Sequence, residues 1–172
     1  MGVSVFDITG QKVLVVGAGR GIGKGIALAF AEAGAEVAIT GLTSTGVDRV
    51  AQEIRALGRV ALPLTGDATK GAEMDRISRQ VLDEFGGLDT LVNCVGDAIR
   101  KPVVTLPGTT AEGMTEEEWH HVLDINLTEA FQGCRAFGSH FLERGQGCVT
   151  NISGWASFRG RPRSSAYDAA KA

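Results

Sequence analysis

The sequence predicts an α/β fold built on a doubly wound parallel sheet, and three observations support this. Short apolar segments alternate with longer ones whose apolar residues recur at helical spacing, three such β-α units follow one another within residues 12–93, and glycines stand at the junctions. Consecutive β-α units imply parallel strands joined by right-handed crossovers. Because ligands of such sheets bind at the carboxyl ends of the strands, we expect the functional site there.

The first half of the chain supplies four strands. The expected elements are strand 12–17, helix 22–33, strand 37–40, helix 47–57, strand 60–64, helix 74–85 and strand 88–93. Gly34, Gly58 and Gly86 follow the three helices, at the position where a left-handed residue commonly ends a helix.

The second half adds one strand and a long helix. The expected order is loop 97–114, helix 115–143, strand 146–153, loop 155–163 and a helical segment from residue 164. Glu118 stands three residues after Thr115, as in a capping box that starts the long helix. Nothing marks an internal boundary, so we expect one nucleotide-binding domain over residues 1–172, with five strands.

Composition excludes several classes of protein. With 172 residues and 44% hydrophobic residues, the chain fits one globular domain. The net charge of −3 provides no basic surface, so neither nucleic acid nor an anionic membrane is an expected partner. The N-terminus lacks a basic segment followed by an apolar core, and no apolar run reaches membrane-spanning length, which predicts a cytoplasmic protein.

Metal binding is not expected. Cys94, Cys134 and Cys148 are widely spaced and form no CxxC pair, which argues against a disulfide framework and a zinc site. His120 and His121 have no acidic or cysteine residues at metal-ligand spacing around them.

The glycine-rich segment 17–23 lies where the first strand gives way to the first helix. A pyrophosphate binds at such a junction because backbone N–H groups are free there and the helix end is positive. Glycine lets the backbone approach the phosphate closely. A tight turn packed on a helix is the alternative, but it needs one or two glycines, whereas this segment has four in seven residues.

This segment resembles the Gly-xxx-Gly-x-Gly turn of the short-chain dehydrogenase/reductase family, matched by Gly17, Gly21 and Gly23. Further motifs match that family in order along almost the whole chain, namely Asp67 after the third strand, Asn93-Cys94-Val95-Gly96 after the fourth, Asn126 in the long helix, and Tyr167 with Lys171 in the last helix. The resemblance implies a Rossmann-type fold and a hydride transfer between NADP(H) or NAD(H) and a small-molecule carbonyl or secondary alcohol.

The resemblance also assigns site residues. The implied catalytic residues are Asn126, Ser153, Tyr167 and Lys171. The implied cofactor-binding residues are Gly17, Gly19, Arg20, Gly21, Ile22, Gly23, Thr43, Asp67, Ala68, Asn93, Gly96, Tyr167 and Lys171. In the family, the aspartate contacts the adenine, the lysine also holds the nicotinamide ribose, and the helix asparagine holds a water in a proton relay.

The spacing of Tyr167 and Lys171 has a chemical purpose. Residues four apart lie on one face of a helix, so the ammonium can stand beside the phenol. A nearby positive charge favours the phenolate, which makes Tyr167 a usable general acid/base. A surface helix pair is the alternative explanation, and the upstream motifs weigh against it.

One position departs from the family pattern. The family places a substrate-binding serine thirteen residues before the tyrosine, and Gly154 stands there. Ser153 is the neighbouring candidate, although a shift of one residue along a strand turns a side chain to the opposite face. Ser157 lies three residues further on. A local bulge or a one-residue difference in the loop would let Ser153 take the role.

The segment after the second strand bears on the cofactor. Residues 40–44 contain no acid, whereas an acid there would bind a ribose 2′-OH and repel a 2′-phosphate. Arg20, with Thr43 and Ser44 as hydroxyl donors, favours NADP(H), and NAD(H) remains the alternative. Arg20 as a solvated turn residue is the other explanation.

Family members continue past the Tyr-xxx-Lys helix, so the resemblance implies an incomplete chain that lacks the later strands and is not itself a competent enzyme. The complete form is expected to be a homo-oligomer. The alternatives are a catalytically silent nucleotide-binding protein, suggested by Gly154, and an inert fragment. Arg159, Arg161 and Arg163 are either contacts for an acidic substrate or a solvated loop.

Overall fold

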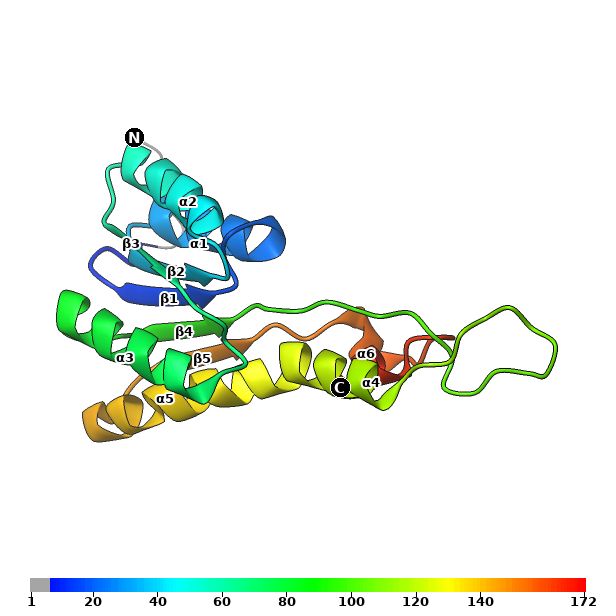
Figure 1. Ribbon diagram of the computed structural model, residues 1–172. Coiled ribbons are helices and arrows are strands. Elements are labelled where there is room, and N and C mark those ends of the chain that lie inside the picture. The colour runs from blue at the N-terminus through cyan, green and yellow to red at the C-terminus, as the bar shows by residue number, and fades with distance from the viewer. Residues whose placement is uncertain (1–6) are drawn as a thin grey trace.

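The computed structural model describes residues 7–172 as a central sheet covered by helices on both faces (Figure 1). Its strands are β1 (Lys12–Val16), β2 (Glu36–Gly41), β3 (Ala61–Thr65), β4 (Thr90–Asn93) and β5 (Cys148–Asn151). The order in the sheet is β3-β2-β1-β4-β5, and each adjacent pair is parallel. The predicted doubly wound parallel sheet of five strands is therefore confirmed.

Helices cover the two faces in pairs. They are α1 (Gly21–Glu32), α2 (Ser44–Ala56), α3 (Gly71–Phe85), α4 (Glu116–Leu123), α5 (Glu129–Arg144) and α6 (Ser165–Lys171), with a π-helical turn η1 (Asp124–Thr128) and a 3-10 turn η2 (Trp155–Phe158). One face packs against α1 and α2, and the other against α3 and α5 (Figure 1).

Strand β1 is at the centre of the core. Val13 and Val15 point into the layer of α1 and α2, whereas Leu14 and Val16 point into the layer of α3 and α5. All four are fully buried, because a central parallel strand has helices on both sides. This is why the strand is a continuous apolar run and not an alternating one.

The chain reverses its direction across the sheet at β1. Units β1 to β3 proceed to one side, whereas β4 and β5 lie on the other side of β1. The two loops that leave β1 and β4 therefore diverge and open a crevice at the carboxyl ends of these strands. The glycine-rich turn after β1 and residues 94–96 after β4 both lie at this crevice.

The prediction of one continuous helix over 115–143 is wrong, because the helix is interrupted in its middle. It begins as expected with a capping box, in which the Glu118 N–H donates to the Thr115 hydroxyl at 3.1 Å and the Thr115 N–H to the Glu118 carboxylate at 3.0 Å. The π-helical turn η1 then separates α4 from α5. The spacing of apolar residues indicates which face of a helix is buried, but it does not show that one turn contains an extra residue. The π-helical turn therefore leaves no signal in the sequence.

Strand β5 is shorter than the predicted 146–153. It pairs with β4 alone and all four of its residues are exposed, with Val149 41% accessible. Cys148 on this strand is exposed, and Cys94 and Cys134 are partly buried, each of them a free thiol. No helix within residues 7–172 is long and apolar enough to cross a bilayer. Half of the N-terminal segment on which the expectation of no signal sequence rests, residues 1–6, lies outside the described residues.

Candidate functional site

A cleft of about 830 Å³ lies at the carboxyl ends of the strands. The loops after β1, β2, β3 and β4 contribute to it, together with residues of α4, η1 and α6. Among the residues predicted for the site, all except Asn93 and Asn126 line this cleft. The tertiary structure thus brings together residues that range in sequence from Gly17 to Lys171.

The glycine-rich turn forms one wall of the cleft. Gly17 has a φ of +83°, and a Cβ added there would lie 2.9 Å from the Cys94 carbonyl oxygen. A Cβ at Gly23 would lie 2.4 Å from the carbonyl oxygen of Gly17. Both positions therefore require glycine, because the turn packs backbone against backbone.

This turn presents unpaired donors to the cleft. The N–H groups of Gly17 and Ala18 donate to the Thr40 carbonyl at 3.1 and 2.8 Å, whereas those of residues 19–23 have no partner within residues 7–172. The first turn of α1 has no acidic residue and no side-chain cap. Free N–H groups at a positive helix end bind anions such as phosphate.

Two cations line the cleft beside the β2–α2 connection. Arg20 comes from the glycine-rich turn and Arg49 from α2, and Leu42 and Thr43 also belong to this part of the lining. No carboxylate from residues 41–49 lines this part of the cleft. The sequence analysis did not identify Arg49, because an arginine in the second turn of a helix is usually exposed to solvent and matches no motif.

Asp67 is fixed by its own turn. Its Oδ1 atom accepts hydrogen bonds from the Thr69 N–H at 2.9 Å and the Thr69 hydroxyl at 2.7 Å, and its N–H donates to Glu73 at 2.9 Å. The second carboxylate oxygen has no partner within the described chain. Asp67 and Ala68 therefore form a preset edge of the cleft after β3.

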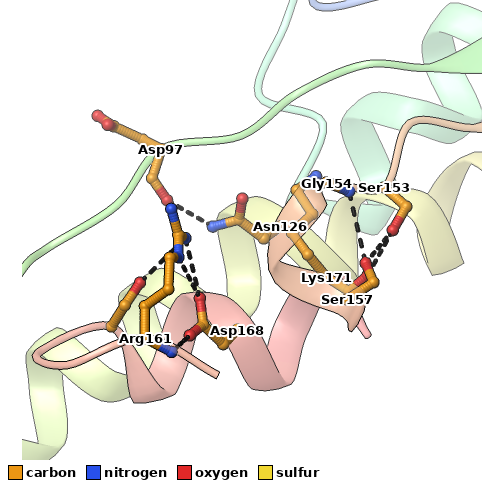
Figure 2. Close-up of polar contacts among 9 residues, drawn as sticks. Asp97, Asn126, Ser153, Gly154, Ser157, Arg161, Asp168 and Lys171 are labelled. Carbon is orange, nitrogen blue, oxygen red and sulfur yellow. Dashed lines mark hydrogen bonds and ion pairs between the residues drawn. The ribbon is translucent and has the colours of Figure 1, made fainter. Parts of the chain in front are cut away.

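The two predicted residues outside the cleft lining are buried asparagines. Asn93 is 1% exposed, and its Nδ2 atom donates to the Asn151 side chain at 2.8 Å. These residues face each other in the register of β4 and β5, so Asn93 joins the ends of two strands. Asn126 in η1 donates to the carbonyl oxygen of Asp97 at 2.7 Å (Figure 2). It also donates to the carbonyl oxygen of Val122 at 2.8 Å.

Gly96 lies between the Asn126 side chain and Lys171 on the cleft floor. The Oδ1 atom of Asn126 is buried without a hydrogen-bond partner within the described residues. A Cβ at Gly96 would lie 2.8 Å from this oxygen and 3.2 Å from the Lys171 Nζ atom. A glycine at this position thus leaves room for Asn126 and Lys171 to approach the same part of the cleft.

Lys171 is buried on the floor of the cleft. It is 8% exposed, and its Nζ atom donates to the carbonyl oxygens of Val95 at 3.0 Å and Ile152 at 3.1 Å. An ammonium has three N–H donors, so one remains available to the cleft. Burial lowers the pKa of Lys171, and the nearby Glu129 and Cys94 act in the opposite direction.

Tyr167 lies on α6, four residues before Lys171, and lines the same cleft. Its ring is 5.5 Å from the guanidinium carbon of Arg161. Arg161 also pairs with Asp168, through its side chain at 2.9 Å and its backbone N–H at 2.7 Å (Figure 2). Arg161 is therefore engaged in holding the start of α6 and not in a solvated loop.

The serines near Gly154 face the end of α6. The Ser153 hydroxyl donates to the Lys171 carbonyl oxygen at 2.6 Å, and the Ser157 hydroxyl contacts the same oxygen and Ser153 (Figure 2). Ser153 lines the cleft, whereas Gly154 and Ser157 do not. The one proton of the Ser153 hydroxyl is thus directed at backbone.

Other cleft residues were not foreseen. His121 at the end of α4, Asp124 and Ile125 in η1, and Asp97 after β4 line the cleft together with Tyr167. Their proximity depends on the π-helical turn and on the path that the loop after β4 takes, and neither of these has a sequence signal. Within the described residues no cluster of side chains is arranged to hold a metal ion.

The strand order and the crevice at the reversal point define a Rossmann-type α/β protein. Residues 11–172 match the family model described as short chain dehydrogenase. The chain therefore belongs to the short-chain dehydrogenase family.

Curated relatives span this chain but are longer. The chain is 36% identical over 166 residues to a 3-oxoacyl-[acyl-carrier-protein] reductase of Synechocystis, covering 96% of this chain and 64% of the relative. It is 37% identical over 166 residues to a 2-dehydro-3-deoxy-D-gluconate 5-dehydrogenase of Bacillus subtilis, covering 96% of this chain and 61% of that protein. The chain thus spans less than two thirds of the length of these relatives.

Solved structures of short-chain dehydrogenases are also similar to this chain, and they too are longer. A putative short-chain alcohol dehydrogenase from Sinorhizobium meliloti superimposes with a TM-score of 0.88 at 33% identity, covering 98% of this chain and 64% of that one. A short-chain type dehydrogenase/reductase from Mycobacterium marinum has a TM-score of 0.88 at 30% identity, covering 97% and 66% of the two chains.

Proposed function

We propose that the protein is an oxidoreductase that uses NADP(H) to interconvert a small-molecule carbonyl and a secondary alcohol. The observation that carries this proposal is the buried Lys171 ammonium on the floor of the cleft that Tyr167, on the same helix, also lines. The names of the two curated relatives, a reductase and a dehydrogenase, support the same reaction class.

The cleft fits a dinucleotide along its length. The free N–H groups of residues 19–23 would hold the pyrophosphate, and Asp67 with Ala68 would hold the adenine. Lys171 would hold the nicotinamide ribose with its remaining N–H, and Gly96 leaves room beside it. When bound, the nicotinamide supplies or accepts the hydride.

The choice of NADP(H) over NAD(H) rests on charge. Arg20 and Arg49 line the cleft near Thr43, and residues 41–49 contribute no carboxylate to the lining. Arginine is well suited to a phosphate because its planar guanidinium makes paired, charge-assisted hydrogen bonds. The 2′-phosphate of NADP(H) would therefore lie between these two side chains.

Tyr167 acts as the general acid and base. In the reducing direction its hydroxyl gives a proton to the carbonyl oxygen as the carbonyl carbon gains a hydride, which yields the alcohol. In the oxidising direction Tyr167 takes that proton back. The positive charge of Lys171 stabilises the phenolate left behind. Asn126, whose buried Oδ1 lacks a partner within the described residues, is suited to hold a water on the path by which Tyr167 is reprotonated.

Ser153 is the proposed hydroxyl partner of the substrate oxygen. It lines the cleft next to Gly154, where the family's serine would stand. To donate to a substrate, its hydroxyl must turn away from the Lys171 carbonyl that it now contacts.

The decisive test is Tyr167→Phe, assayed with NADPH and a panel of ketones that includes 3-oxoacyl thioesters and keto-sugar acids. Loss of the proton donor lowers turnover by about 100-fold or more, while NADPH binding, followed by its fluorescence, persists. Turnover near the original rate would overturn the assignment. NADPH binding without turnover of any ketone by the unmodified protein would instead support a catalytically silent nucleotide-binding protein.

A further inference from the structure

Arg161 fastens the loop after β5 to the helix that carries Tyr167. Its backbone N–H donates to one oxygen of the Asp168 carboxylate at 2.7 Å, and its Nη2 and Nε atoms donate to the other at 2.9 and 3.3 Å (Figure 2). The Nη2 atom also donates to the Ser164 hydroxyl at 3.2 Å. Asp168 is 9% exposed and Ser164 is 3% exposed, so burial fixes both partners. The guanidinium is therefore held in one place.

The guanidinium held in this way lies over the Tyr167 ring. Its central carbon is 5.5 Å from the centre of that ring, which is within the range of a cation–π contact. The same carbon is 5.9 Å from the centre of the Trp155 ring, which belongs to η2 and directly follows Gly154. Arg161 therefore contacts both the proposed proton donor and an aromatic side chain of the loop after β5.

Lys171 has a different part in the site. Its ammonium donates to the carbonyl oxygens of Val95 and Ile152 on the floor of the cleft. Arg161 does not line the cleft, so it contacts the tyrosine from outside the space that a cofactor and a substrate would occupy. One cation is thus open to bound molecules, whereas the other contacts only the protein.

Helix α6 depends on this contact because its own start is weakly held. It is seven residues long, and the side chain of its N-cap residue, Ser164, makes no capping hydrogen bond. Short helices gain little stability from their own hydrogen bonds. The turn at residues 162–163 returns the chain to α6, with Arg163 in the left-handed conformation at a φ of +61°. Such a backbone is costly for arginine, so contacts like that of Arg161 with Asp168 must hold it.

We propose that Arg161 is a positioning residue whose guanidinium holds the Tyr167 ring from outside the cleft, so that the phenol hydroxyl keeps one place at the substrate carbonyl. This inference rests on the proposed function, because the place of the hydroxyl matters only if Tyr167 exchanges the proton. Proton transfer requires the donor and the acceptor within hydrogen-bond reach, and a ring that is free to turn loses that alignment. Asp168 and Ser164 contribute by holding the guanidinium.

The contact is tested first without any turnover. Tyr167 is the only tyrosine in the sequence, so protein labelled with ¹³C-tyrosine gives ring signals in NMR spectra that need no further assignment. Arg161→Met removes the cation, and the ring signals shift and broaden because the ring is no longer held in one orientation. The matched control is Arg159→Met, which removes the neighbouring cation 6.0 Å from the Trp155 ring and leaves the tyrosine signals in place. Identical signals in Arg161→Met and wild type would overturn the contact.

The catalytic consequence is tested by separating kcat from KM. We expect Arg161→Met to lower kcat, counted per NADPH-binding site, by about tenfold, because a small displacement of a catalytic group is costly. KM for the ketone and the dissociation constant of NADPH stay within about twofold of wild type, since Arg161 does not line the cleft. An unchanged kcat would overturn the proposal, and so would a tenfold rise in KM at constant kcat.

A second variant separates positioning from stability. Arg144→Met breaks the 3.0 Å salt bridge with Asp89, which lies just before β4 at the opposite end of the sheet. It lowers the free energy of unfolding, measured with denaturant, but its kcat per NADPH-binding site stays at the wild-type value. A loss of kcat as large as that of Arg161→Met would show an effect of stability alone and would overturn the proposal.

Arg161→Lys carries the test if Arg161→Met does not fold. Lysine keeps a cation for Asp168 but lacks the planar group that can pair with a carboxylate and lie on a ring at once. Its tyrosine signals shift, and its kcat falls below that of wild type. Unchanged signals together with an unchanged kcat would overturn the proposal. If the wild type turns over no ketone, the proposed function fails, while the ring signals still decide whether Arg161 holds Tyr167.

Discussion

The Ser153 hydroxyl donates a hydrogen bond of 2.6 Å to the backbone carbonyl oxygen of Lys171. Side chains at the end of β5 therefore hold the end of α6, and the hydroxyl nearest the family's serine position is occupied by the protein itself. Gly154, which stands at that position, has no side chain to offer to a substrate oxygen.

We expect Gly154→Ser to raise the rate of ketone reduction. A new hydroxyl donor to the substrate oxygen is worth about 1 kcal/mol, which corresponds to roughly a fivefold gain in kcat/KM. The matched control is Gly154→Ala, which adds the Cβ without the hydroxyl. Equal rates for the two variants would mean that Ser153 or a water already supplies the donor.

The arginines beside Thr43 should determine the choice of cofactor. Arg20→Ala and Arg49→Ala each remove one cation from the proposed 2′-phosphate site, so each weakens NADPH binding by roughly tenfold and leaves NADH binding nearly unchanged. Fluorescence titration with both cofactors measures this. Arg79→Ala, at an exposed position on α3 outside the cleft, is the control. Tighter binding of NADH than of NADPH to the unmodified protein would contradict the preference.

The contact of Arg161 with Asp168 should stabilise the protein at neutral pH, and this stabilisation should be lost in acid. Burial raises the pKa of the Asp168 carboxyl, but the hydrogen bonds from Arg161 outweigh it and hold this pKa below its ordinary value. The stabilisation is therefore present above the unfolded-state pKa and is lost as pH falls through the folded-state value. Asp168→Asn lowers the denaturant midpoint at neutral pH, and the difference from wild type shrinks in acid. A difference that is independent of pH would contradict this account.

Glu129 should have the opposite effect on stability. Its pKa is raised by burial to about 8 in the folded protein, so its contribution is fully present below the unfolded-state pKa and is lost as pH rises through the folded-state value. Glu129→Gln removes this dependence and therefore gains stability relative to wild type between about pH 5 and pH 8. Each pH unit by which the folded-state pKa exceeds the unfolded-state pKa corresponds to about 1.4 kcal/mol of unfolding free energy. We therefore expect the variant to gain at least about that much relative to wild type. Denaturant titrations at both pH values measure it, and parallel behaviour of the two proteins would contradict the prediction.

The sequence was sufficient for the fold. Apolar periodicity and glycines at the junctions predicted the parallel sheet, because secondary structure and its burial are determined by local spacing. The glycine-rich turn was also visible, since glycines clustered at one strand–helix junction leave a signal in sequence. The capping box of Thr115 and Glu118 is another local feature, and it is confirmed.

The tertiary structure alone decided how the site is built. Arg49 lines the cleft, Asn93 binds Asn151 outside the cleft lining, and the Ser153 hydroxyl donates to the Lys171 carbonyl oxygen. The sequence could not predict these three positions, because each depends on contacts between elements that are distant in sequence. Glu129 looks like any helix glutamate in the sequence. Only the packing of the start of α5 in the folded chain removes it from water, and desolvation is a property of the folded chain that no local pattern encodes.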